Sequence, residues 1–294
     1  MKIILGPSSQ DLGQKVARLT NIDVVPVASK IFPDGEVYIR LEGNVEGEHA
    51  VIVHTTSPPQ NQHLMQLAFI ADACKREGAE KVTAVVPYLA YARQDKVFLK
   101  GETISIEAVA RMLRAVGVGS LLTVNIHQEK ALEKFPFPAK TVSAIPLLAR
   151  YFRQKGLSGV FILAPDKGAM HIAEEAKAIL GGECGHLEKQ RDRYTGQINV
   201  ETGNFTLKGE TVIIIDDIIS TGGTIAAAAK IAKALGAQRI LVACVHALLI
   251  ADAKQRILES GVEEIVGTDS VPGEASKVTL APIISQEIKA LQSA

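Results

Sequence analysis

Few cysteines, no net charge and no long apolar run limit what this chain of 294 residues can be. Its three cysteines, Cys74, Cys184 and Cys244, are scattered and show no CxxC spacing. That pattern argues against a disulfide framework or a zinc site and is typical of a reducing cytoplasm. Lysine plus arginine and aspartate plus glutamate both total 32, so the basic excess of a duplex-binding surface is missing. Nucleic acid is therefore not an expected partner.

No stretch of the sequence is apolar enough to anchor the chain in a membrane. The longest apolar run, ILVACVHALLI, is interrupted by His246 and is too short to span a bilayer. The apolar run in the N-terminal MKIILGPSS is too short for a signal peptide. We therefore expect a soluble, cytoplasmic protein with no membrane partner.

What the sequence does contain is an alternation of short β-branched runs with longer helical patterns. Runs such as KIILG, AVIVHT, KVTAVVPY and TVIIID are apolar and continuous, and segments such as TIAAAAKIAKALG lie between them. Continuous apolar strands joined by helices are typical of a parallel sheet that is covered on both faces. The predicted fold class is α/β, and the length suggests about two domains.

Two landmarks recur along the chain at one fixed spacing. KIILGPSS lines up with VFILAPDK and pairs Pro7 with Pro165, whereas REGAEKVTAVV lines up with ALGAQRILVAC and pairs Gly78 with Gly236. The offset is 158 residues in both cases. Two copies of one α/β domain would explain this repeat, although α/β segments also resemble one another by chance.

The boundary between the two copies is expected near FPFPAKTVSAIP, where three prolines interrupt the periodic pattern. We therefore predict an N-terminal domain over residues 1–142 and a C-terminal domain over residues 143–294. The tail reads as a short strand and a helix, about 281–294, which could pack on either half, including the N-terminal domain.

The stretch VIIIDDIISTGGT, residues 212–224, carries the strongest functional signal. A buried strand runs into two carboxylates and then into a turn before a helix, at the edge of an α/β sheet where ligands bind. Unpaired amides, glycines without a Cβ and hydroxyl donors suit a phosphate monoester, and carboxylates suit the hydroxyls of a sugar. The pattern predicts a ribose 5-phosphate site made of Asp216, Asp217, Ser220, Thr221, Gly222, Gly223 and Thr224. The alternative is that Ser220 or Thr221 caps the helix and the aspartates are solvated.

DDIISTGGT resembles the ribose-5-phosphate loop shared by type I phosphoribosyltransferases and phosphoribosyl pyrophosphate synthetases, also called ribose-phosphate pyrophosphokinases. Two further segments are similar to the synthetases. FPDGE, residues 32–36, resembles their adenine loop, and PYLAYARQDK, residues 87–96, resembles their second ATP segment. The resemblance implies an ATP site made of Phe32, Asp34, Gly35, Glu36, Arg93, Gln94 and Asp95. Taken alone, FPDGE is also an ordinary turn, and residues 87–96 could be a solvated charged loop.

The same resemblance implies catalytic cations and a metal site. EKQRDR, residues 188–193, lies where the family carries a Lys-x-Arg pair, which implies Lys189 and Arg191 as catalytic residues, with Arg191 also at the ribose 5-phosphate. Two cations at alternating positions could converge on charge developing at phosphorus, although an isolated charge run is usually solvated. His127 and Asp166 match the family's residues beside Mg²⁺–ATP, so Mg²⁺ is the implied cofactor. His127 is the weaker ligand because Mg²⁺ prefers oxygen.

The resemblance, which is strongest to the shorter branch known mainly from archaea, implies two tandem type I phosphoribosyltransferase-like domains. It implies a ribose-phosphate diphosphokinase that uses ATP and ribose 5-phosphate and forms a homo-oligomer with active sites near subunit interfaces. The alternatives are a type I phosphoribosyltransferase and a catalytically silent regulatory subunit. Two departures, Ala169 in place of the second glycine of Asp-x-Gly-Gly and the segment KVFLKGETIS after Asp95, leave regulation by nucleotides open.

Overall fold

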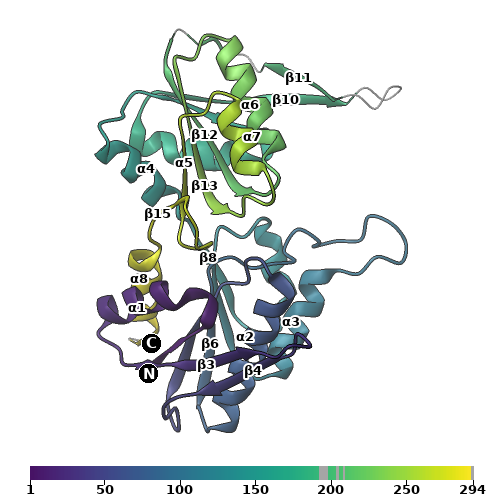
Figure 1. Cartoon of the computed structure of the whole chain (residues 1–294), viewed down its shortest axis with the longest axis vertical. Coiled ribbons are helices and arrows are strands. Elements are labelled where there is room, and N and C mark those ends of the chain that lie inside the picture. Colours follow the sequence, from purple (N-terminus) through teal and green to yellow (C-terminus); the bar gives the residue numbers. More distant parts are fainter. Residues whose placement is uncertain (192–197, 203–204, 208, 293–294) are drawn as a thin grey trace. The chain divides into compact units, whose positions relative to one another are not determined.

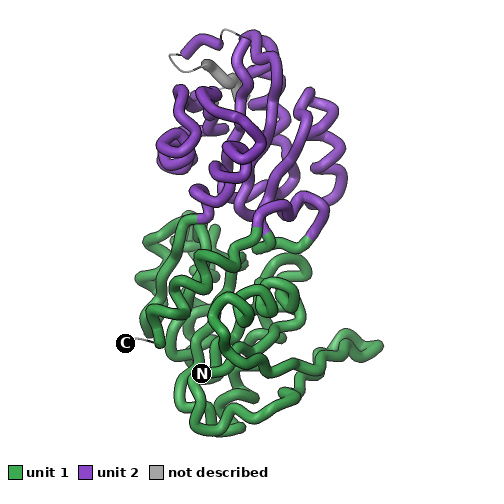
Figure 2. Tube along the Cα trace, turned by 90° about the vertical axis from the view of Figure 1, so that its left-hand side faces the viewer, with its two compact units in different colours: residues 1–143, 269–272, 279–294 green, residues 144–268, 273–278 purple. Residues whose placement is uncertain are grey.

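The computed structural model describes residues 1–191, 198–202, 205–207 and 209–292, and the chain divides into two compact units (Figure 2). Unit 1 consists of Met1–Ser143, Asp269–Pro272 and Thr279–Ala294, and unit 2 consists of Ala144–Thr268 and Gly273–Val278. No helix in the described part of the chain is long and apolar enough to cross a membrane.

A parallel sheet with the strand order β2-β1-β5-β6-β7-β8 forms the centre of unit 1. Helices α1 and α8 lie on one side of this sheet and α2 and α3 on the other (Figure 1). The antiparallel hairpin β3–β4 packs beside α2. The elements are β1 (Lys2–Leu5), η1 (Pro7–Ser9), α1 (Gln10–Thr20), β2 (Val24–Val25), β3 (Val27–Ile31), β4 (Val37–Leu41), β5 (His49–Val53), α2 (Gln60–Arg76), β6 (Lys81–Val86), α3 (Ser105–Ala115), β7 (Ser120–Val124), η2 (Glu129–Lys134), β8 (Ala139–Val142) and α8 (Ala281–Gln292).

The C-terminal segment of the chain belongs to unit 1, where α8 packs against α1. The Asp269 carboxylate fastens this segment, because it accepts hydrogen bonds from Lys15 Nζ at 3.0 Å and from Thr279 Oγ1 at 2.6 Å. Lys140 also donates to Glu287 of α8 at 2.6 Å. These contacts join the two ends of the chain within one unit.

The sheet of unit 2 has the strand order β11-β10-β9-β12-β13-β14-β15 and is parallel except for the pair β10–β11. The apolar strand residues Val212, Ile214 and Val242 are buried under α6 and α7, with Ala228 and Ile257 in the same cluster. The elements are α4 (Ile145–Gln154), β9 (Phe161–Ala164), η3 (Lys167–Ala169), α5 (Met170–Leu180), β10 (Glu183–Arg191), β11 (Ile198–Thr202), β12 (Thr211–Ile219), α6 (Gly223–Ala234), β13 (Arg239–Ala247), α7 (Ala253–Glu259), β14 (Glu264–Thr268) and β15 (Ser276–Val278).

The two sheets repeat one topology. When the parallel strands of each unit are numbered in chain order, both sheets have the order 2-1-3-4-5-6. The predicted α/β class with two related domains is therefore confirmed.

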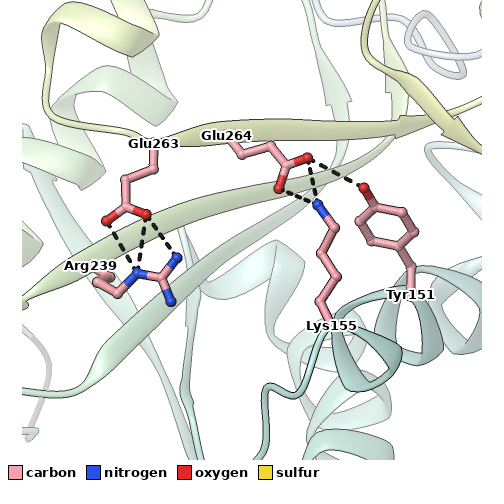
Figure 3. Close-up of polar contacts among 5 residues, drawn as sticks. All are labelled: Tyr151, Lys155, Arg239, Glu263 and Glu264. Carbon is pink, nitrogen blue, oxygen red and sulfur yellow. Dashed lines mark hydrogen bonds and ion pairs between the residues drawn. The ribbon is translucent and has the colours of Figure 1, made fainter.

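Polar contacts hold the amino-terminal edge of the sheet in unit 2 (Figure 3). Arg239, the first residue of β13, donates from Nη2 to Glu263 at 2.9 Å. Lys155, just past α4, donates to Glu264 at 2.9 Å, and the Tyr151 hydroxyl donates to the same carboxylate at 3.3 Å. All of these contacts lie where the parallel strands begin. The carboxyl ends of the strands lie at the opposite edge of the sheet, so these contacts do not occupy it.

Candidate functional site

The predicted phosphate-binding turn lies where the strand order of the unit 2 sheet reverses. From β9 the chain continues through α5 to β10 on one side, whereas from β12 it continues through α6 to β13 on the other. In open α/β sheets, ligands bind at such a switch point, beyond the carboxyl ends of the strands. The turn at residues 220–224 follows β12 and Asp166 follows β9, so both lie at this edge.

Three carboxylates interact at the same edge. Asp216 and Asp217 lie within β12, which continues two residues beyond them to Ile219. Asp216 Oδ1 accepts from the N–H of Asp217 at 2.9 Å, and Asp217 Oδ1 accepts from the N–H of Ile218 at 2.8 Å. Burial, then the neighbouring charge of Asp217, raises the pKa of Asp216 to about 8, and the charge of Asp166 adds to this effect. Such an edge suits a ligand that brings hydroxyl donors or a cation.

The two adjacent glycines of the turn have different surroundings. Gly222 has a φ of +74°, and a Cβ there would lie 3.0 Å from the side chain of Ile257 and 3.1 Å from the carbonyl oxygen of Ala253. Gly223 has an ordinary φ, and a Cβ there would meet no atom within 4 Å. The fold therefore requires glycine at 222, whereas at 223 the chain leaves open space beside the backbone.

Amide groups of the turn also have no hydrogen-bond partner among the residues that the structure describes. In the described part of the chain, the N–H groups of Thr221 and Gly222 donate no hydrogen bond. Gly223 and Thr224 begin α6, and the first N–H groups of a helix have no partner within it. The N-cap position is held by Gly222 rather than by a capping serine or threonine side chain. An open cradle of amides therefore faces the space beside Gly223, a geometry that suits an anion.

The corresponding edge of unit 1 is filled by the protein itself. It lies between β1 and β5, where Ser8 Oγ donates to the carbonyl of Thr55 at 2.7 Å and Ser9 Oγ accepts from the N–H of Thr55 at 2.8 Å. His54 is fully buried there, and a Cβ on Gly6 would lie 2.4 Å from its ring. The repeated topology thus offers an open edge only in unit 2, among the described residues.

The candidate adenine loop forms the tip of the β3–β4 hairpin in unit 1. The N–H of Phe32 donates to the carbonyl of Glu36 at 2.8 Å, and Asp34 Oδ1 accepts from the N–H of Glu36 at 3.1 Å. The tip is exposed, with Lys30 Nζ 4.8 Å from the centre of the Phe32 ring. A cavity of 570 Å³ lies beside it and is lined by Gly35, Glu36, Val37, Asn61, Gln62, Met65 and Phe69.

The second candidate ATP segment lies past the carboxyl end of β6, also in unit 1. Arg93 is exposed, Gln94 and Asp95 are half-buried, and Gln94 Nε2 donates to the carbonyl of Lys96 at 3.2 Å. Tyr91, two residues before Arg93, donates from its hydroxyl to Asn61, which lines the cavity beside the adenine loop. This bond connects the second ATP segment to the cavity beside the candidate adenine loop.

The candidate metal ligands lie in different units, with His127 in unit 1 and Asp166 in unit 2. His127 is exposed, three residues beyond β7. Asp166 Oδ1 accepts from the N–H groups of Gly168 at 2.9 Å and Ala169 at 3.3 Å, which fixes the carboxylate beyond β9. In the described part of the chain, no three His, Cys, Asp or Glu side chains gather closely enough to hold a metal ion by themselves. Asp166 offers the oxygen donor that Mg²⁺ prefers, and Mg²⁺ takes most of its other ligands from water and substrate phosphates.

The candidate catalytic residues Lys189 and Arg191 occupy alternate positions of β10 in unit 2. Opposite them in β11 are Val200 and Ile198. Their side chains lie outside the described part of the chain.

Comparisons with known proteins agree with the two-domain topology. The N-terminal domain of ribose phosphate pyrophosphokinase matches residues 1–117, and the phosphoribosyl transferase domain matches residues 138–276. The ribose-phosphate pyrophosphokinase of Saccharolobus solfataricus is 41% identical over 92% of this chain and 93% of its own length. That of Methanothermobacter thermautotrophicus is 40% identical over 98% of this chain and 100% of its own length.

The chain belongs to the ribose-phosphate pyrophosphokinase family. The crystal structure of phosphoribosylpyrophosphate synthetase from Mycobacterium smegmatis superposes with a TM-score of 0.88 at 29% identity, over 100% of this chain and 98% of that chain. The predicted membership in the ribose-phosphate pyrophosphokinase family and the predicted pair of phosphoribosyltransferase-type domains are therefore confirmed.

The contribution of α7 to the turn was not predicted from the sequence. Ile257 supports Gly222, and Arg256 contacts the carbonyl of Thr221. In the sequence, Asp252 and Arg256 have the spacing of a common surface ion pair, so nothing there indicates that Arg256 also reaches a turn 35 residues away.

Proposed function

We propose that the chain transfers the β,γ-pyrophosphoryl group of Mg²⁺–ATP to the 1-hydroxyl of ribose 5-phosphate, giving 5-phosphoribosyl 1-pyrophosphate and AMP for nucleotide biosynthesis. The observation that carries the proposal is the open amide cradle at residues 220–224, next to paired carboxylates at a sheet switch point. Relatives that match nearly the whole chain and are named ribose-phosphate pyrophosphokinases support the same reaction.

In this proposal, ribose 5-phosphate binds at the carboxyl edge of unit 2. Its phosphate accepts hydrogen bonds from the amides of the turn and from the hydroxyls of Ser220, Thr221 and Thr224. Asp216 and Asp217 accept hydrogen bonds from the ribose hydroxyls, and Arg191 adds a positive charge. The open space at Gly223 supports a close approach of the phosphate to the backbone.

ATP binds through the two loops of unit 1. Phe32 stacks on the adenine, Asp34 and Glu36 accept from its exocyclic amine, and Gly35 allows the tight turn between them with its φ of +94°. Arg93, with Gln94 and Asp95, holds the phosphates, since a guanidinium can donate two parallel hydrogen bonds to a phosphate.

Lys189 and Arg191 stabilise the negative charge that develops on the transferred group, and positioning of the two substrates supplies much of the remaining acceleration. Mg²⁺, when bound, neutralises charge on the phosphates of ATP. Asp166 would hold it directly through oxygen, and His127 would bind a phosphate or a metal-bound water.

We further propose a cytoplasmic homo-oligomer. The scattered cysteines, which are free thiols in the structure, support a reducing compartment. Exposed apolar side chains around the β3–β4 hairpin support contacts between subunits.

Incubation of the purified protein with ATP, ribose 5-phosphate and Mg²⁺, without a nucleobase, tests the reaction. We expect AMP and 5-phosphoribosyl 1-pyrophosphate in equal amounts and no ADP, because a pyrophosphoryl group rather than a phosphoryl group is transferred. ADP as the nucleotide product, or no turnover without a base, would contradict the proposal.

A further inference from the structure

The segment that links β13 to α7, together with α7 itself, occupies one side of the phosphate-binding turn. Three successive carbonyl oxygens before and within the turn accept hydrogen bonds from it. The pairs are Leu249 N to Ile219 O at 3.1 Å, Ile250 N to Ser220 O at 3.0 Å and Arg256 Nη1 to Thr221 O at 3.1 Å.

These bonds set the direction of the amides that follow each carbonyl. In a trans peptide, the C=O and the next N–H point in opposite directions. With their carbonyls turned toward residues 249–256, the peptides direct the N–H groups of Ser220, Thr221 and Gly222 to the other side. Rotation of the Thr221–Gly222 peptide would instead present a carbonyl oxygen to the cradle, where it would repel an anion.

Arg256 is the only one of these three donors that is a side chain. Its Nη2 also donates to both oxygens of Asp252 at 2.9 Å, so the carboxylate orients the guanidinium fork while Nη1 reaches the turn. The next residue, Ile257, packs against Gly222 and fixes the distance between α7 and the turn. The orientation of the Thr221–Gly222 peptide thus depends on residue identity at position 256.

We propose that Arg256 is a positioning residue for the reaction: it holds the Thr221–Gly222 peptide so that the amide of Gly222 faces the phosphate of ribose 5-phosphate. Asp252 assists by orienting the guanidinium. The proposal rests on the proposed function of the turn and makes Arg256 specific to the sugar substrate, since Arg256 contacts the turn that is proposed to hold the sugar phosphate.

Steady-state kinetics of Arg256→Ala test this role. We expect KM for ribose 5-phosphate to rise about fivefold to tenfold, the size of one ordinary hydrogen bond, with KM for ATP unchanged. Arg256→Lys keeps the charge but lacks the fork and should show an intermediate KM. Millimolar guanidinium chloride should partly restore the KM of Arg256→Ala. Arg239→Ala is the matched control, because Arg239 pairs with Glu263 at the opposite edge of the same sheet (Figure 3) and should leave both KM values unchanged.

An unchanged KM for ribose 5-phosphate in folded Arg256→Ala would overturn the proposal, as would an equal rise in both KM values without guanidinium rescue. Should Arg256→Ala not fold, Arg256→Lys and Asp252→Asn decide by the same measurement. Gly223→Val, measured in parallel, distinguishes a failure of the proposed function of the turn from a failure of the positioning role of Arg256. If it leaves KM for ribose 5-phosphate unchanged, the proposed function of the turn fails; if it raises that KM while Arg256→Ala does not, only the positioning role fails.

Discussion

At the scale of single residues, Gly222 and Gly223 differ in what a side chain at each position would meet. Position 222 combines a left-handed backbone with contacts to Ile257 and Ala253, whereas position 223 has neither restriction. Glycine at 223 is therefore not explained by packing within the chain. A ligand that approaches the backbone explains it, because a Cβ would occupy the ligand's place.

Substitutions at the two glycines should separate stability from substrate binding. Gly222→Ala should lower the free energy of unfolding by about 1–3 kcal/mol because it places a Cβ in a left-handed conformation. Gly223→Val should unfold close to the wild-type temperature but raise KM for ribose 5-phosphate on the order of tenfold, because its methyl groups separate the phosphate from the amides. Thermal unfolding and initial-rate kinetics on both variants check this; equal effects of the two on stability would contradict it.

The lysine of the Lys-x-Arg pair allows a test of catalysis. Lys189→Ala should fold and bind ribose 5-phosphate but lose on the order of 10²- to 10³-fold in kcat, by analogy with the loss of one oxyanion donor. Lys230→Ala, on the exposed face of α6, is the control and should keep wild-type turnover. Near wild-type kcat in Lys189→Ala would remove this residue from the mechanism.

At the scale of elements, buried His54 connects the end of β5 to η1 and to α2. Its Nε2 donates to the carbonyl of His63 in α2 at 2.9 Å, and its Nδ1 lies 3.0 Å from Ser8 Oγ. Burial lowers the pKa of His54 from 6.5 to about 3. The folded protein therefore keeps this imidazole neutral under conditions in which the unfolded chain binds a proton.

The stability of unit 1 should depend on pH because of this histidine. Stability is complete above pH 6.5 and is lost as the pH falls toward 3, since only the unfolded chain gains a proton in that range. Between pH 7.5 and 4.5 the loss should be about 2–3 kcal/mol. Urea unfolding followed by circular dichroism at the two pH values measures it. His54→Gln should be less stable at pH 7.5 but show a smaller loss, and an equal loss in both proteins would contradict the assignment.

The strand pattern could be predicted from sequence because parallel strands buried on both faces are continuous apolar runs. The repeat was also visible in single residues: Gly78 and Gly236 both follow helices with positive φ, 83° and 98°, a position that favours glycine. The closed edge of unit 1 could not be predicted, since its bonds join residues about 46 positions apart, such as Ser8 and His54. The phosphate-binding turn could be predicted from its motif. The hydrogen bond from Arg256 to the turn could not, because it depends on a tertiary contact alone.

At the scale of the whole molecule, the residues proposed for the two substrates divide between the two units. The ATP loops belong to unit 1, and the carboxylates and the amide cradle belong to unit 2. Among the described residues, the carboxyl-terminal edge of the unit 2 sheet keeps open amides, whereas that of unit 1 is packed with its own side chains. The proposed function therefore gives the two units different roles. Neither unit alone carries the residues proposed for both substrates, and the relatives match over nearly the full length of the chain.

The exposed surface of unit 1 predicts that the chain self-associates in solution. Large apolar side chains that are 37–50% exposed gather on the β3–β4 hairpin and the adjoining face of α2: Ile31, Phe32, Tyr38, Met65 and Phe69. Contiguous apolar surface of this kind is typical of protein–protein contacts. We expect light scattering to give a mass that is a multiple of 31.4 kDa. Phe69→Glu should lower that mass and raise KM for ATP, because the adenine loop is part of the same hairpin. Leu19→Glu places a charge on an exposed leucine of α1, outside this surface, and should change neither the mass nor KM for ATP. A monomeric wild type, or equal effects of the two variants, would contradict an interface at the hairpin.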